Sequence, residues 1–146
     1  MDLFFIVLAL AAGACAPIQA GVNSQLRLVT QDPVLASLIS FTVGTLALLA
    51  YSLLARIPWP AAGPFLVLPW WMWTGGFLGA FLVLVSVILA PKLGAATMLG
   101  FMIAGQMVTS MVLDHYGWIG YEHHPATVWR LLGAALLVAG VILIKK

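Results

Sequence analysis

Residues 3–25 read LFFIVLALAAGACAPIQAGVNSQ, a stretch without a charged side chain. An α-helix needs about 20 mainly apolar residues to cross the hydrocarbon layer of a bilayer, so this stretch predicts a membrane-spanning helix. Four further runs have the same character. The chain is therefore predicted to be an all-α membrane protein, with residues 1–146 forming a single transmembrane domain, a five-helix bundle. The predicted spans are about Leu3–Gln25, Val34–Ala55, Trp70–Ala90, Leu93–Leu113 and Val128–Ile144.

The composition excludes most other classes of protein. The 146 residues are 64% apolar and 7% charged, with a mean hydropathy of +1.13. A soluble domain carries about a quarter charged residues, and disorder requires low hydrophobicity, so neither fits. A net charge of +2 gives no reason to expect a nucleic-acid partner. The single cysteine, Cys15, excludes an intramolecular disulfide framework.

The breaks between the runs have identifiable causes. Arg27 and the pair Asp32-Pro33 are expected to separate the first two spans, and a segment with three prolines at 56–64 follows the second. Pro91-Lys92 predicts a tight turn between the third and fourth spans, and the polar stretch 114–127 precedes the last. Because no Lys or Arg precedes the first run, we expect a retained span and not a cleaved signal peptide.

Five spans place the two termini on opposite sides of the membrane. The side of the N-terminus has two basic residues near the spans, and the other side has four: Arg27, Lys92, Lys145 and Lys146. An excess of cytoplasmic Lys and Arg fixes orientation, and so small a bias also permits insertion both ways up. All six tryptophans lie at or near the first side, as an interfacial belt or as the lining of a substrate entrance.

Amide side chains at membrane depth are the candidate functional groups. Gln19 and Asn23 are one helical turn apart in the first span, Ser40 lies in the second and Gln106 near the middle of the fourth. Pro17 interrupts the hydrogen-bond ladder beside Gln19 and predicts a helix kink. Uncompensated polar groups are costly in hydrocarbon, so these residues either line a pathway or clamp helices together.

No Asp, Glu, Lys, Arg or His lies in the central part of a predicted span. Asp114 and His115, at one end of the fourth span, form a possible ion or proton site, although an interfacial helix-end carboxylate is the favoured interpretation of Asp114. The histidines and Glu122 of the 114–127 loop match no metal-ligand spacing. We therefore expect no metal, no cofactor and no enzymatic activity.

Small residues recur at helical spacing. Gly75 and Gly79 are four apart in the third span, and Gly133 and Gly140 are seven apart in the fifth. Such residues let membrane helices approach closely, either within one bundle or at the seam of a dimer.

Several stretches resemble a known family. PIQAGVNSQL at 17–26, SFTVGT at 40–45, WTGGFLGA at 73–80, AGQ at 104–106 with LDHYG at 113–117, and RLLG at 130–133 are similar to the bacterial YdcZ-type family of the drug/metabolite transporter (DMT) superfamily. The resemblance covers essentially the whole chain. It implies a five-span unit of the bacterial inner membrane, equivalent to half of a ten-helix transporter. It also implies dual insertion with antiparallel pairing, or pairing with a homologous subunit.

Five spans are few for a solute pathway, so we expect a homodimer. Gln19 lies about 7 Å past the midpoint of its predicted span, away from the side of the N-terminus, and Gln106 lies about 4 Å past the midpoint of its own span, towards that side. Inverting one copy brings these two amides into the same leaflet. The sequence thus predicts an antiparallel dimer with a polar site of Gln19, Asn23, Ser40 and Gln106, which carries a neutral or weakly charged small solute by alternating access. A small-solute or ion channel, or a structural membrane protein without transport, are the alternatives.

Overall fold

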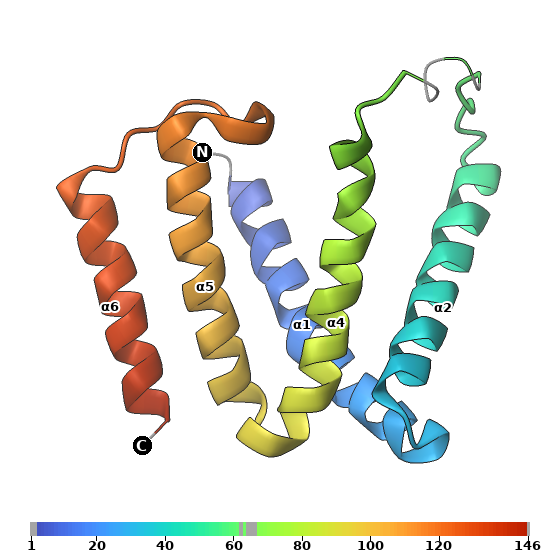
Figure 1. The fold of residues 1–146 in the computed structure, drawn as a ribbon, viewed down its shortest axis with the longest axis horizontal. Helices are drawn as coiled ribbons and strands as arrows, with labels where there is room; N and C mark the ends of the chain where they lie inside the picture. The colour runs from blue at the N-terminus through green and yellow to red at the C-terminus, as the bar shows by residue number, and fades with distance from the viewer. Residues whose placement is uncertain (1–2, 62, 64–66, 146) are drawn as a thin grey trace. The chain divides into compact units, whose positions relative to one another are not determined.

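A computed structural model describes residues 3–61, 63 and 67–145 of the chain, and over this part the regular structure is helical (Figure 1). The prediction of an all-α membrane protein is confirmed. Among the described residues, five α-helices and two short 3₁₀ turns follow one another in the order α1 (Leu3–Thr30), α2 (Pro33–Leu54), η1 (Trp70–Trp73), α4 (Thr74–Leu93), α5 (Ala95–Tyr116), η2 (Trp118–Gly120) and α6 (Val128–Ile144).

Each predicted span falls on one of these helices. Four segments are long and apolar enough to cross a membrane, namely Leu3–Thr30, Pro33–Leu54, Trp70–Leu93 and Ala95–Tyr116. The fifth, α6, has 17 residues and is about 25 Å long, close to the thickness of a hydrocarbon core. Most large apolar side chains are exposed, as expected where lipid is the solvent for the outer surface.

The described chain divides into two compact units, residues 1–91 and 92–146. In the first unit, α1 contacts α2, and Ala36 of α2 meets Val83 and Val87 of α4 in a small core against which Leu26 of α1 packs. These core positions are mostly small or β-branched side chains, which allow close helix contact. The core joins the start of α2 and the second half of α4, and Arg27 of α1 contacts the Val87 carbonyl beside it.

In the second unit, α5 and α6 run antiparallel and contact each other along their lengths (Figure 1). Met98 and Met111 of α5 and Val141 of α6 are buried. A Cβ placed on Gly100 would lie 3.0 Å from both methyl groups of Val141. A side chain at position 100 would therefore require Val141 to shift by a few tenths of an ångström.

The first helix is longer than predicted. Arg27 does not end it, because the helix continues to Thr30. It ends at Gln31, which adopts a φ of 57° and donates its backbone N–H to the carbonyl of Arg27 at 2.7 Å. Asp32 then caps α2, its Oδ1 accepting from the N–H groups of Val34 and Leu35 at 2.7 and 2.9 Å. Such a cap satisfies donors that the first turn leaves open.

The prediction of a tight turn at Pro91-Lys92 is wrong. Both residues lie inside α4, which ends at Leu93, and the residue that separates α4 from α5 is Gly94, whose φ is 78°. A proline one turn from a helix end removes only one backbone hydrogen bond, whereas a positive φ favours glycine. The break between the two helices therefore falls on the glycine.

Candidate functional site

Asn23 is the buried amide of the first unit. It is 4% exposed, and with Ala20 it forms the buried face of α1. Its Nδ2 has no hydrogen-bond partner among the described residues. An unsatisfied buried donor costs about 1–3 kcal/mol, which makes Asn23 the candidate for a polar contact from outside the chain.

Gln19 lies differently, although it is only one turn away. Its side chain is exposed on the outer surface of the unit. The sequence placed both amides on one face, and the structure puts Asn23 inside the packed face and Gln19 outside it. Pro17 is partly buried within a helix that runs continuously from Leu3 to Thr30, and its kink stays a prediction.

Two serines of α2 lie near this part of the fold. Ser40, the predicted pathway residue, is partly buried. Ser37, one turn earlier, is 7% exposed, and its hydroxyl donates to the Pro33 carbonyl at 2.8 Å. The hydroxyl of Ser24 on α1 likewise donates to the Ala20 carbonyl at 2.7 Å. Because these protons are used by the backbone, the hydroxyl oxygens remain as acceptors.

Arg27 is a functional candidate that the sequence analysis treated as a break between spans and as one of the charges that bear on orientation. Its guanidinium Nη1 lies 3.5 Å from the backbone carbonyl of Val87 on α4. Pro91 stands four residues after Val87 and has no N–H with which to bond that carbonyl. The sequence shows that Pro91 leaves the Val87 carbonyl without a helical donor and that Arg27 lies near a helix end. Only the tertiary fold shows that these two groups meet.

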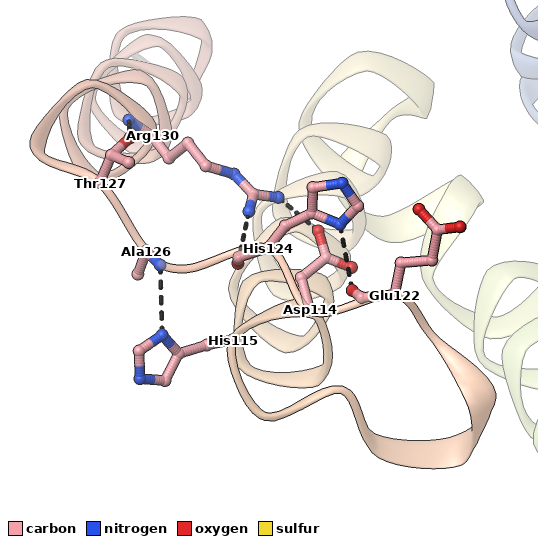
Figure 2. A network of polar contacts seen from close by, with 7 residues as sticks. All are labelled: Asp114, His115, Glu122, His124, Ala126, Thr127 and Arg130. Atoms are coloured by element: carbon pink, nitrogen blue, oxygen red, sulfur yellow. Dashed lines mark hydrogen bonds and ion pairs between the residues drawn. The ribbon is translucent and has the colours of Figure 1, made fainter.

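The second unit carries an ionic network at the α5–α6 end (Figure 2). The carboxylate of Asp114, in the last turn of α5, forms an ion pair with Arg130 in the first turn of α6. Arg130 also donates to the His124 carbonyl at 2.9 Å, and the His124 N–H donates to the Asp114 carbonyl at 2.8 Å. This carboxylate is thus neutralised by a neighbouring helix, as expected for a structural link more than for an ion site.

The histidines of the loop serve backbone groups. His115 Nδ1 accepts from the Ala126 N–H at 3.2 Å, and the His124 ring lies 3.0 Å from the Glu122 carbonyl (Figure 2). Within the described ranges, no group of three His, Cys, Asp or Glu side chains is placed to hold a metal ion. Gln106, the predicted site residue of α5, is exposed on the surface of this unit.

The four predicted packing glycines differ in their surroundings. A Cβ on Gly79 would lie 3.6 Å from the ring of Phe41, so this glycine packs α4 on α2. A Cβ on Gly75, Gly133 or Gly140 would meet nothing within 4 Å in the described part of the same unit. The faces that carry these three glycines are therefore uncovered within their units.

Two of the cavities among the described residues lie between neighbouring helices. One of about 290 Å³ lies between α5 and α6 beside Met111, His115 and Leu131. The other, of about 400 Å³, lies between α2 and α4 beside Ser37, Phe41 and Phe81. Both are lined almost entirely by apolar side chains, so they suit acyl chains or a packed helix better than a polar solute.

The described residues form apolar helices, four of them long enough to cross a membrane, and an ion pair links α5 to α6. These features define the class of multi-pass membrane proteins. A family model described as "Putative inner membrane exporter, YdcZ" matches residues 4–143, nearly the whole chain. The chain belongs to this family, and it is a multi-pass inner membrane protein.

One relative is the "Inner membrane protein YdcZ" of Escherichia coli (strain K12). It is 32% identical over 77 residues, which are 53% of this chain and 51% of the relative. The match thus spans about half the length of that curated protein. No solved structure matches the chain.

Proposed function

We propose that this protein is a small-molecule exporter that works by alternating access as an antiparallel homodimer. Gln19, Asn23 and Ser40 of one copy and Gln106 of the other would line the shared polar site. The observation that carries the proposal is the state of Asn23, whose amide is buried in a membrane-spanning unit with an open hydrogen-bond donor. A bundle that used its amides only as glue would satisfy them internally.

The exposed amides support a second copy. Gln19 and Gln106 face outward from their units, and lipid chains offer them no hydrogen-bond partners. The open faces of Gly75, Gly133 and Gly140 would let another helix approach closely. A partner that covers these surfaces would bury the amides and supply the polar contacts that lipid lacks.

An inverted partner suits the function better than a parallel one. Gln19 and Gln106 lie within about 4 Å of the midpoints of α1 and α5, so in an inverted pair both amides would lie near the midplane. In an antiparallel pair of identical chains, the inward-open and outward-open states interconvert by exchange of the two conformations, so their energies match in a symmetric membrane. Rocking of one copy against the other would then alternate access to the site.

Water accessibility of the proposed site tests the proposal. In a Cys15→Ser background, single cysteines would replace Gln19, Asn23 and Gln106, and a membrane-impermeant maleimide would be applied to protein in vesicles. The matched control positions are apolar residues of the same helices that are more than half exposed, where we expect lipid to surround them: Ile18, Val22 and Val108. We expect the three site cysteines to react and the controls to stay protected by lipid. Labelling of site and control positions at equal, low rates would contradict a wet pathway.

Orientation is tested by a cysteine at Gln31, an exposed residue between α1 and α2. Dual insertion predicts that part of the population reacts in sealed cells and the remainder only after permeabilisation. A population that reacts entirely from one side would exclude the antiparallel homodimer and leave pairing with a homologous subunit.

A further inference from the structure

Arg27 stands one helical turn after Asn23 on α1. Residues four apart share one face of an α-helix, with Cβ atoms about 5–6 Å from each other. Helical side chains lean toward the N-terminus of their helix, so the Arg27 stem points back toward the turn of Asn23. The contact with the Val87 carbonyl places the guanidinium beside the core of Ala36, Val83 and Val87.

The charge of Arg27 is not neutralised within its unit. No carboxylate of the described residues lies within 4 Å of the Arg27 guanidinium. The ion pair of the described residues joins Asp114 and Arg130, in the other unit. The nearest acid along the chain, Asp32, uses its Oδ1 to cap α2. The Val87 carbonyl, at 3.5 Å, is at the outer limit of a hydrogen bond.

Two open donors thus occupy one turn of α1. The Asn23 amide is 4% exposed and has an unpartnered Nδ2, and the partly buried guanidinium of Arg27 has donors to spare. A partly buried charge without a partner is costly. An anion with two or more oxygens would satisfy both groups, because guanidinium binds carboxylate and phosphate through paired hydrogen bonds.

We infer that Asn23 and Arg27 form a binding site for an oxyanion group, a carboxylate or a phosphate. As a statement about the carried solute, the inference deepens the proposed function and rests on it: the substrate is an organic anion and not a neutral molecule. The phosphate of a lipid headgroup has the same chemistry, and the test separates these two sources.

The test uses the purified full chain in nanodiscs of phosphatidylcholine. Succinate or inorganic phosphate is added in increasing concentration, with sodium chloride of equal ionic strength as the control, and the thermal unfolding midpoint is measured. Anion binding to the folded state raises this midpoint with concentration. We expect a saturable rise for the wild-type chain and for Arg56→Met, which removes an exposed arginine of the same unit.

Two variants should abolish the response. Arg27→Met keeps the apolar stem and removes the charge. Asn23→Asp is nearly isosteric and supplies a carboxylate four residues before Arg27, which is a favourable helical spacing, so it should fill the site internally and remain folded. Each variant should weaken anion binding at least about tenfold, as loss of a charge-assisted hydrogen bond implies.

A second set of nanodiscs contains phosphatidylglycerol. A rise in the midpoint with this lipid that depends on Arg27, without a response to soluble anions, identifies the ligand as a headgroup phosphate. Absence of both responses, or equal responses in the wild type and Asn23→Asp, overturns the inference. Because these measurements report binding alone, they fail or succeed independently of the thiol accessibility that tests the exporter proposal.

Discussion

Asp114 and Arg130 join the last turn of α5 to the first turn of α6 through an ion pair (Figure 2). The loop between them returns to the same point, because the His124 carbonyl accepts from Arg130 and the His124 N–H donates to the Asp114 carbonyl. Thr127 adds a cap, its Oγ1 accepting the Arg130 N–H at 3.3 Å. The pair therefore holds both the helix ends and the connecting loop.

Removing one partner of this pair should destabilise the second unit. The side chains of Arg130 and Asp114 are 35% and 22% exposed, so solvent screens the pair, and we expect a coupling of about 1 kcal/mol. A double-mutant cycle of Asp114→Asn and Arg130→Gln, measured by equilibrium unfolding in mixed micelles, gives this value. Glu122→Gln changes an exposed carboxylate of the same loop and should leave stability unaltered. Additive single effects would show that the pair contributes nothing.

Gly100→Ala should loosen the contact of α5 with α6. The new Cβ would lie 3.0 Å from both methyl groups of Val141, an overpacking that typically costs about 1–3 kcal/mol. Gly105→Ala, on the same helix with nothing within 4 Å, gains only the helix propensity of alanine, about 1 kcal/mol.

Because both variants gain this helix propensity, we expect Gly100→Ala to be about 1–3 kcal/mol less stable than Gly105→Ala. Val141→Ala should relieve the clash, so the unfolding free energy of Gly100→Ala should fall much less in that background. Equal effects at the two glycines would show that α6 moves away at no cost.

The cap of α2 should have a measurable effect. Asp32→Ala removes the acceptor for the N–H groups of Val34 and Leu35 and should cost about 1 kcal/mol, whereas Asp32→Asn retains an acceptor and should cost less. The unfolding free energies of the two variants in micelles provide the comparison. Equal losses for asparagine and alanine would mean that the carboxylate charge, and not the cap hydrogen bonds, is what matters.

Hydropathy was sufficient to locate the five helices, because a helix that crosses the bilayer must be long and mainly apolar, and both properties can be recognised in the sequence. The ends were less certain: α1 passes Arg27 and reaches Thr30, since a long polar side chain at a helix end need not interrupt the helix. The turn predicted at Pro91-Lys92 moved to Gly94, where a positive φ is required. Proline and glycine both signal turns, and only the backbone geometry shows which of them makes the turn.

The candidate site was predictable in its residue types and not in its arrangement. Spacing put Gln19 and Asn23 on one face of a helix, but burial separates them, because packing against α2 covers only part of that face. The role of Arg27 depends on a backbone carbonyl sixty residues away, which no local pattern encodes. Asp114 was proposed as an ion site because its partner, sixteen residues later, could not be identified from spacing.

The last prediction concerns the Val87 carbonyl. Pro91, four residues later, has no N–H to donate to this carbonyl, and the guanidinium of Arg27 contacts it instead. Arg27→Met should leave this carbonyl unsatisfied and lower the unfolding free energy by about 1 kcal/mol. Pro91→Ala restores an N–H four residues after Val87 and, in a helix, competes for the same carbonyl. In that background the loss caused by Arg27→Met should shrink to a few tenths of a kcal/mol, which unfolding of the four proteins of this cycle in mixed micelles would reveal. If the loss is the same in both backgrounds, Arg27 stabilises the unit by some contact other than the carbonyl that proline sets free.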